Sequence, residues 1–365
     1  MSRCIEPGRL QIVRSILKSI LLGLLLIAVD EGSLSGQEKS ADGPVTTLRI
    51  YENLVQVPVV VLGPTFELMR PFAARRFYVS LDSGPPFQAT HVRFEGDDPI
   101  ALSILIDLNA YDVDVTDLGH AIAHLAPRSL QSRDRVSIYA LRHCEMWHVA
   151  KDAAPALDVL GEKISNIKQD WPGGWEKQQT EDCRHKVMLL DGLTQVIGNA
   201  STMPGRRVVL VLSDGKDAGS KRNWVDVKEF ATSTAVTVFG LRETHAATDG
   251  FFFPDRDPES AFRVLCESSG GLVFSSTVTS LRYKLNDFME LLRKRYIVEF
   301  PRPDDIETGR HTIEVTISKS NPFIRSSGIT VPTADPETLS DPNTIRTDPA
   351  HAPTVGKRKP LAVPQ

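Results

Sequence analysis

From residue 100 onward, short apolar runs alternate with segments in which apolar residues recur every three or four positions. The apolar runs are typical of parallel strands covered on both faces, and the longer spacing is typical of amphipathic helices. The predicted strands are 100–106, 135–141, 207–212, 235–240 and 271–274. The predicted helices are 118–125, 157–167, 189–197, 224–232, 258–268 and 279–294. This alternation predicts a doubly wound, mostly parallel sheet in an α/β/α sandwich.

On either side of this region the pattern changes to alternation of single apolar and polar residues, which is typical of antiparallel strands. Residues 54–61 and 77–94 contain short strands, with a turn predicted at 82–86. Residues 296–300 and 313–317 alternate on either side of a turn. We therefore expect a small N-terminal antiparallel β appendage and a separate C-terminal β-hairpin.

The start of the chain has the pattern of an export signal. Basic residues precede an apolar run at 20–29 that is too short to cross a bilayer, and Ser33 and Ser35 have the spacing of a cleavage site. We expect cleavage near residue 36 and a secreted or periplasmic mature protein without a membrane span. Retention of the segment as an uncleaved anchor is the alternative.

These patterns divide the chain into six segments. They are a signal peptide at 1–35, a linker at 36–46, a β-rich appendage at 47–98, an α/β domain at 99–294, the β-hairpin at 295–333 and a disordered tail at 334–365. The tail is expected to be disordered because it is rich in Pro, Asp, Thr and Lys and has few apolar residues.

Charge and cysteine content narrow the functional classes. Among 365 residues, 42 Lys and Arg are balanced by 46 Asp and Glu, so we expect neither nucleic acid nor anionic lipid as a partner. Three cysteines follow the signal segment. A disulfide between Cys144 and Cys183 and three buried free thiols are both compatible with the sequence.

Two predicted strands end in an acidic residue, Asp107 and Asp214, each followed by a polar turn. Since the carboxyl ends of parallel strands share one edge of the sheet, both carboxylates are expected there, where they can share a divalent cation. Trp171 and Trp175 lie on a long loop expected near this edge, and Trp is common in binding hot spots. Folding of this loop onto its own domain is the alternative.

Other catalytic and metal motifs are not supported by the local pattern. His143 and His148 are five residues apart, whereas a zinc-binding helix places two His four residues apart, so no zinc site is expected. The chain contains no Gly-rich phosphate loop and no G-x-S-x-G elbow. We therefore expect a protein that is not an enzyme.

The sequence resembles the von Willebrand factor type A domain over about residues 48–330, and in particular the VWFA-related exported proteins of acidobacteria. The matching segments are VQVPVVVLG, YVSLDSG, DRVSIYAL, VVLVLSDGKDAGS and KRYIVEF. The resemblance implies a doubly wound fold with a metal-ion-dependent adhesion site, which holds Mg²⁺ or Mn²⁺ at the carboxyl edge of the sheet.

The match to that adhesion site is incomplete. Asp107 and Asp214 match its two Asp ligands, but Asn109 and Tyr111 replace its two Ser ligands, and Val187 replaces its Thr ligand. The remaining metal-binding candidates are Asp107, Asn109 and Asp214. We therefore expect a degenerate site with no resident cofactor and at most weak binding of Mg²⁺ or Mn²⁺, because Mg²⁺ demands near-ideal octahedral geometry.

The resulting hypothesis is an exported, non-enzymatic, adhesion-like module. It would bind a protein or a cell-envelope component through Tyr111, Trp171 and Trp175 at the carboxyl edge of the sheet. Two alternatives remain open. One is an exported metal-dependent hydrolase that uses Asp107 and Asp214 with a His from 143–148, and the other is a structural envelope protein whose site has decayed.

Overall fold

The structure is a computed structural model of the whole chain. It describes residues 54–64, 66–109, 115–125, 130–175, 180–243, 261–301, 309–326, 329–331 and 356. The predicted signal peptide, the linker and all of the predicted tail except Gly356 lie outside the described residues. Within the described residues, no helix is both long and apolar enough to span a membrane.

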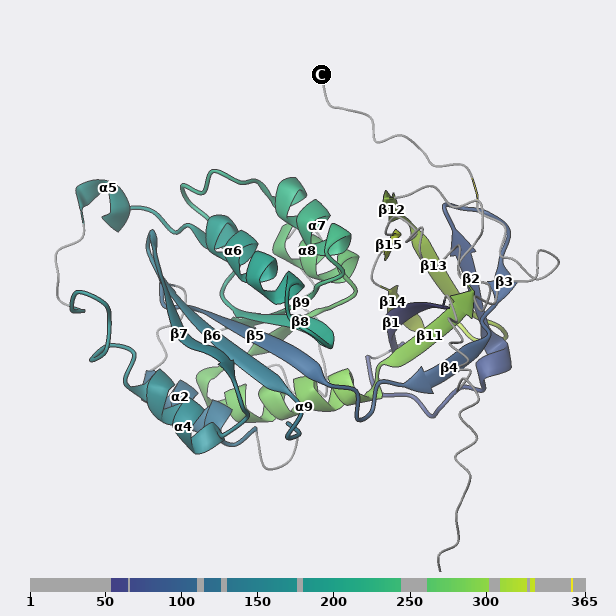
Figure 1. Cartoon of the computed structure of the whole chain (residues 1–365), viewed down its shortest axis with the longest axis horizontal. Coiled ribbons are helices and arrows are strands. Elements are labelled where there is room, and N and C mark those ends of the chain that lie inside the picture. The colour runs from purple at the N-terminus through teal and green to yellow at the C-terminus, as the bar shows by residue number, and fades with distance from the viewer. Residues whose placement is uncertain are drawn as a thin grey trace, which may run out of the picture. The chain divides into compact units, whose positions relative to one another are not determined.

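A six-stranded, mostly parallel sheet forms the centre of the α/β part, in the order β10-β9-β8-β5-β6-β7 (Figure 1). Its strands are β5 (Ile100–Asp107), β6 (Arg135–Arg142), β7 (Glu145–Ala153), β8 (Arg206–Leu212), β9 (Thr237–Glu243) and β10 (Val273–Ser276). Only β7 is antiparallel to its neighbour. The five predicted strands are confirmed, and β7 is an addition at the edge.

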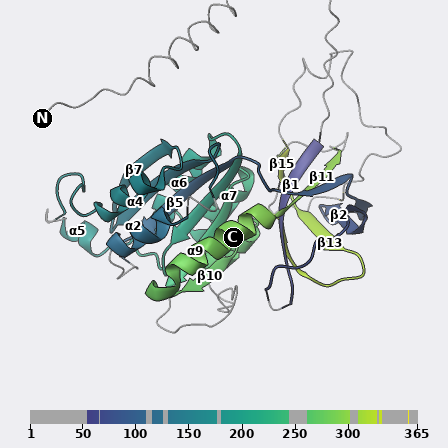
Figure 2. The ribbon, with the colours of Figure 1, turned by 90° about the horizontal axis from the view of Figure 1, so that it is seen from below.

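Helices flank both faces of this sheet. One face carries α2 (Val115–Ala123), α4 (Leu157–Ser165) and α9 (Leu281–Lys294), and the other carries α6 (Leu189–Ser201), α7 (Trp224–Ser233) and α8 (Ala261–Ser268) (Figures 1 and 2). Alternate residues of β5 enter opposite cores: Ile104 and Ile106 face the first helix group, and Leu105 faces the second. The expectation of a mostly parallel sheet with flanking helices is confirmed.

Strands from both ends of the described chain combine in antiparallel sheets. One sheet has the order β14-β1-β11-β4, another β13-β2-β3, and a third pairs β12 with β15. The strands are β1 (Leu54–Leu62), β2 (Phe77–Leu81), β3 (Phe87–Gln88), β4 (His91–Phe94), β11 (Tyr296–Pro301), β12 (Gly309–His311), β13 (Ile313–Ile317), β14 (Phe323–Ser326) and β15 (Ile329–Val331). Their apolar side chains form a third core cluster that includes Val59, Val79 and Val298.

This pairing corrects the expectation of a C-terminal β-hairpin. The strands predicted at 296–300 and 313–317 exist as β11 and β13, but they lie in different sheets. A strand has only two edges, and those of β11 are occupied by β1 and β4. Strand β13 pairs with β2 instead. The N-terminal and C-terminal strands therefore share sheets and do not form two separate appendages.

Candidate functional site

Strands are added to the sheet in opposite directions from β5 and from β8. From β5 it continues through α2 to β6 on one side, whereas from β8 it continues through α7 to β9 on the other side. Strands β5 and β8 are parallel neighbours, so this boundary is a topological switch point. Ligands of open α/β sheets bind in the crevice at the carboxyl ends of such strands. Asp107 ends β5, and Ser213 and Asp214 follow β8 directly, which places all three at this position.

The carboxylate of Asp107 is buried, and both of its oxygens accept hydrogen bonds from the protein. Its Oδ1 accepts hydrogen bonds from the backbone N of Asn109 at 3.0 Å and from Nδ2 of Asn109 at 2.9 Å. Its Oδ2 accepts one from Oγ of Ser213 at 2.7 Å. Burial raises the pKa of Asp107 above its ordinary value, the hydrogen bonds from Ser213 and Asn109 oppose that rise, and the nearby charge of Asp214 adds to it.

Asn109 connects Asp107 to the turn between β6 and β7. Its Oδ1 accepts a hydrogen bond from the backbone N of His143 at 2.8 Å. His143 has a positive φ of 56°, and its carbonyl accepts a hydrogen bond from the N of Met188 at 3.0 Å. The Asn109 amide therefore fixes a left-handed turn residue, a contact that spans 34 residues of sequence and that the strand-end pattern did not indicate.

Asp214 is the most accessible member of the group, with 23% of its side chain exposed. Its Oδ1 accepts a hydrogen bond from the backbone N of Lys216 at 2.9 Å, and its Oδ2 pairs with Nζ of Lys216 at 2.7 Å. Gly215 between them has a φ of 80°, and a Cβ there would lie 2.9 Å from the ring of Phe262. The turn after β8 therefore requires glycine, and it presents Asp214 and Lys216 outward.

The rest of the SDGKDAGS segment attaches to the start of α6. Oδ1 of Asp217 accepts from the backbone N of Leu190 at 2.9 Å, and Oγ of Ser220 accepts from the N of Asp191 at 3.2 Å. Helix α6 needs these acceptors because its own N-cap is Met188, whose side chain makes no capping hydrogen bond. The sequence pattern did not indicate these roles of Asp217 and Ser220. The missing polar N-cap was the signal that a partner had to come from elsewhere.

Trp171 is not available for partner binding, which corrects the sequence-based expectation. Only 5% of it is exposed, its Nε1 donates to Oε2 of Glu145 at 3.3 Å, and its ring meets those of Trp147 and Trp175 edge-on. The alternative interpretation, that the loop folds onto its own domain, holds for Trp171. The large apolar surface of the Trp171 indole is therefore buried within the protein, where it contributes to the stability of the core.

Trp175 lies partly buried at the edge of the same cluster. The Arg142 guanidinium lies 4.1 Å from its ring centroid, and Nη1 of Arg142 donates to the Trp175 carbonyl at 2.7 Å. Part of the Trp175 side chain therefore remains accessible on a backbone that Arg142 holds in place. Tyr111 lies outside the described residues.

A disulfide joins Cys144 and Cys183, which decides between the two alternatives left open by the sequence. It connects the turn between β6 and β7 to α5 (Glu181–Arg184), a short helix in the long segment before α6. Cys266 is free and buried, and burial raises the pKa of its thiol well above the ordinary value. The disulfide therefore restrains the chain next to His143 and hence next to Asn109.

The donor set does not fit a divalent cation. Both carboxylate oxygens of Asp107 and the amide oxygen of Asn109 already accept hydrogen bonds from the protein. Val187 has no donor atom, and the outward carboxylate of Asp214 faces the Lys216 ammonium. Within the described part of the chain, no group of three His, Cys, Asp or Glu residues is placed to hold a metal ion. Mg²⁺ requires several oxygen ligands in octahedral geometry, which this arrangement does not offer.

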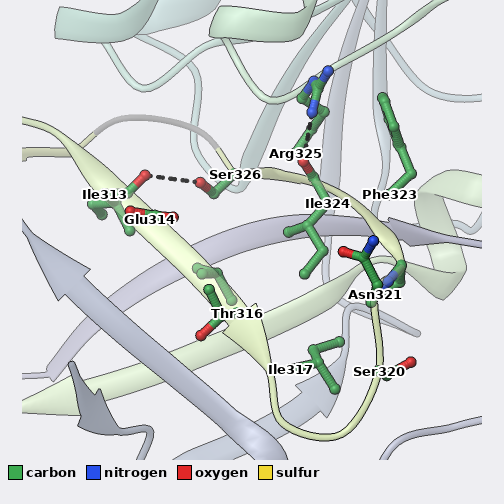
Figure 3. Close-up of a pocket in the computed structure, with 12 residues that line it drawn as sticks. Ile313, Glu314, Thr316, Ile317, Ser320, Asn321, Phe323, Ile324, Arg325 and Ser326 are labelled. Carbon is green, nitrogen blue, oxygen red and sulfur yellow. Dashed lines mark hydrogen bonds between the residues drawn. The ribbon is translucent and has the colours of Figure 1, made fainter.

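A groove lies between β13 and β14, far along the sequence from this site. Figure 3 shows the side chains of Ile317 and Ile324 between the two strands, and Oγ of Ser326 donates to the Ile313 carbonyl at 3.2 Å. The groove has a volume of about 480 Å³. Most of its lining is strand and turn, and it contains none of the sequence-predicted site residues.

Comparisons with known proteins give low similarity. No family model matches the chain, and no curated protein matches it. The TFIIH p34 N-terminal domain is 12% identical, with 53% of this chain and 98% of that chain covered and a TM-score of 0.38. Proximal thread matrix protein 1 from the mussel byssus is 11% identical, with 58% and 49% covered and a TM-score of 0.39. A structure of the same mussel protein has a zinc-occupied MIDAS motif, with 12% identity, 55% and 49% covered and a TM-score of 0.37. The chain thus spans about half of the mussel protein.

Proposed function

We propose that this protein is an exported, non-enzymatic binding module with a von Willebrand factor A-like fold. It recognises a protein or a cell-envelope component at the carboxyl edge of its parallel sheet. The observation that carries the proposal is the position of Asp107, Ser213 and Asp214 at the switch point between β5 and β8. The turn after β8 exposes Asp214 and Lys216 at this edge.

The sequence motifs support the family assignment. Asp107 ends the first strand of the sheet, and the SDGKD segment follows β8, the neighbour of that strand, as the resemblance implies. The site is degenerate, because Asn109 and Val187 replace hydroxyl ligands and Asn109 already bonds to His143. We therefore propose weak metal dependence or none.

The burial of the polar centre favours binding over catalysis. Asp107 and Ser213 are both 0% exposed and bond to each other, so neither reaches a substrate in this arrangement. A hydrolase would need a nucleophile or a water-activating group within hydrogen-bond reach of the reacting atom. This argues against the metal-dependent hydrolase, and the outward turn at Asp214 and Lys216 argues against a merely decayed site.

The disulfide supports export. Structural disulfides persist in oxidising compartments such as the periplasm and the extracellular space. The Cys144–Cys183 bridge therefore agrees with the signal-like segment at the start of the chain. Secretion or a periplasmic location is the proposal that follows.

Capture of a partner by the purified mature protein tests the proposed function. The immobilised protein is incubated with a cell-envelope extract, and retained proteins are quantified by mass spectrometry. Asp214→Ala, Lys216→Ala and Trp175→Ala should each reduce the retention of a specific partner, and Tyr111→Ala tests the remaining predicted contact. Phe94→Ala is the matched control, because Phe94 is 39% exposed on β4 in the antiparallel part. Retention that depends on Phe94 and not on the edge residues would place the binding site elsewhere.

A further inference from the structure

Two segments lie side by side at the carboxyl edge of the sheet, residues 184–191 and 214–222, and we call them the paired loops. Val187 and Ala218 form an antiparallel bridge, with N–H···O distances of 2.8 Å in both directions. Farther along, Oδ2 of Asp191 accepts from the backbone N of Lys221 at 3.0 Å, and Oδ1 of Asp191 accepts from the N of Arg222 at 3.1 Å. These bonds hold the two segments together without using any basic side chain.

The acidic side chains of the paired loops bond to backbone amides. Asp191 accepts from two amides of the opposite segment, and Asp217 accepts from the N of Leu190 at 2.9 Å. Asp214 accepts from the N of Lys216 at 2.9 Å. All three acidic residues of the paired loops therefore accept hydrogen bonds from backbone amides of the protein.

Three of the basic side chains of the paired loops are exposed, and two others form ion pairs, Lys186 with Asp182 and Lys216 with Asp214. The paired loops contain five Lys or Arg residues, namely Arg184, Lys186, Lys216, Lys221 and Arg222. Arg184, Lys221 and Arg222 are exposed, and the Lys216 side chain is 85% exposed. Among the described residues, no acidic side chain lies within ion-pair distance of Arg184, Lys221 or Arg222. The paired loops carry five basic and three acidic residues, whereas the whole chain has a net charge of −4.

We propose that the paired loops bind an acidic peptide segment of the partner protein, with Arg184, Lys221 and Arg222 as the contacting cations. This inference rests on the proposed function and names the chemistry of the partner at the same edge of the sheet. The ammonium and guanidinium groups come from two separate segments, which suits several carboxylates along an extended chain better than one compact anion.

Two other anionic partners fit less well. A single phosphate is usually held by converging backbone N–H groups at a helix start, but Asp217 and Ser220 already accept from the first amides of α6. An anionic membrane is usually recognised by a cluster of about four to eight Lys or Arg residues. Among the basic residues of the paired loops, only Arg184, Lys221 and Arg222 lack an ion pair within the described part of the chain. An acidic peptide is therefore the favoured ligand.

Fluorescence anisotropy with a labelled Glu-rich peptide tests this inference on the mature protein at low ionic strength and with added salt. The wild-type protein should bind the peptide, and added salt should weaken binding, because exposed charges are screened. The variant Lys221→Glu/Arg222→Glu should bind at least about tenfold more weakly. It should fold normally, because only the backbone amides of these two residues hold Asp191.

The matched control is Lys151→Glu/Lys319→Glu, which changes the net charge by the same amount at two exposed lysines on β7 and on the turn after β13. It should leave affinity within about twofold of the wild type. An equal loss in both variants, or no salt-sensitive binding by the wild type, would overturn the inference. The inference would also be overturned if the protein does not bind the peptide but binds phosphatidylglycerol vesicles, and if that binding depends on Lys221 and Arg222.

The same variants separate this inference from the proposed function. If partner capture depends on Trp175 or Asp214 but is unchanged in Lys221→Glu/Arg222→Glu, the edge binds a partner and the acidic-segment inference is wrong. If the peptide binds at the paired loops but no envelope partner is retained by the edge, the proposed function fails and the anion-binding surface remains.

Discussion

Asp107 shows how hydrogen bonds from the protein can satisfy a buried carboxylate at the edge of a sheet. Three hydrogen bonds, two from Asn109 and one from Ser213, supply the donors that a buried charge requires. The same bonds tie the end of β5 to the turn after β8. Asp107 therefore links the carboxyl ends of the two strands, and Asp214 is the more exposed of the two carboxylates.

The donor arrangement predicts that divalent cations do not stabilise the protein. A ligand that binds only the native state raises stability by RT ln(1 + [L]/Kd), so a resident metal would raise the melting temperature. We expect no rise with millimolar Mg²⁺ or Mn²⁺ in differential scanning fluorimetry, because Asp107 and Asn109 are already engaged.

Two sets of variants test this expectation. A rise in melting temperature with Mg²⁺ that disappears in Asp107→Ala and Asp214→Ala would contradict it. Restoring hydroxyl ligands through Asn109→Ser, Tyr111→Ser and Val187→Thr should create a Mg²⁺-dependent rise if these positions match the adhesion site.

Asp287 on α9 gives a pH-dependent prediction. Burial raises its pKa above the ordinary value of 3.8, the Lys284 charge opposes the rise, and the Glu290 charge adds to it. The native state therefore binds the proton more readily than the unfolded state, so ionised Asp287 costs stability at neutral pH and this cost shrinks as the pH falls towards the ordinary carboxyl range. Asp287→Asn should stabilise the protein against urea near neutral pH, and the gain should decrease at about pH 4. A gain that is the same at both pH values would contradict the assignment.

At the scale of elements, α2 and α4 cross with their backbones in contact. A Cβ on Gly119 would lie 2.5 Å from the Gly161 carbonyl oxygen, and a Cβ on Gly161 would lie 2.8 Å from the Gly119 carbonyl oxygen. Gly119→Ala should therefore destabilise the protein by about 1–3 kcal/mol in urea unfolding. This loss should appear although Ala is the better helix former by about 1 kcal/mol.

Gly198→Ala is the control for that prediction. Gly198 lies in α6, and a Cβ there would meet the Phe230 ring at 3.8 Å, an ordinary contact. This substitution should stabilise the protein by about 0.4–1 kcal/mol, because it removes conformational freedom only from the unfolded chain. Equal effects at the two glycines would mean that the α2–α4 crossing is looser than the structure shows.

Elements with a local sequence pattern could be predicted, whereas elements that depend on distant partners could not. The strands of the parallel sheet are buried on both faces, as β5 is throughout, so continuous apolar runs identified them. Strand β7 was missed because it is half-buried and follows β6 after a two-residue turn, where its mixed residues show no clear period. The pairing of β1 with β11 was missed because the paired residues lie more than 230 positions apart, as Val59 and Tyr296 do. Strand patterns do not specify such distant partners.

The same difference between local and long-range contacts applies to the candidate site. The strand-end pattern correctly placed Asp107 and Asp214 at one edge of the sheet. The bonds from Asn109 to His143 and from Asp217 to the start of α6 join separate loops, so no local motif contains them. Trp171 packs against Trp147 of β7, a strand that the sequence pattern did not predict.

At the scale of the whole molecule, two connections run between the parallel sheet and the antiparallel sheets, and they meet at a buried ion pair. Arg295 lies between α9 and β11, and Glu95 lies between β4 and β5. Their side chains are 1% and 0% exposed, and Nε and Nη2 of Arg295 donate to the Glu95 carboxylate at 2.7 and 2.9 Å. Because Glu95 and Arg295 each lie in one of the two connections, loss of the ion pair should weaken the coupling between the parallel sheet and the antiparallel sheets.

Removal of one partner should be far more damaging than removal of both. Glu95→Gln or Arg295→Met leaves the other charge buried and uncompensated, so each should destabilise the protein by about 3–5 kcal/mol in urea unfolding. Each should also make the transition broader, since weaker coupling between the two groups of sheets lowers cooperativity. The double variant Glu95→Leu/Arg295→Met should recover most of the loss, because apolar groups carry no desolvation cost and Nη1 of Arg295 is buried with no hydrogen-bond partner among the described residues.

Lys294→Ala next to this pair provides the control, because Lys294 pairs with Glu290 where the two side chains are 52% and 42% exposed. An exposed pair of this kind contributes about 0–1 kcal/mol, so this variant should unfold nearly as the wild type does. Single substitutions at Glu95 and Arg295 that cost no more than Lys294→Ala would show that the buried pair does not couple the two groups of sheets. Additive losses in the double variant would show that the two side chains act independently, since coupled partners give a non-additive double-mutant cycle.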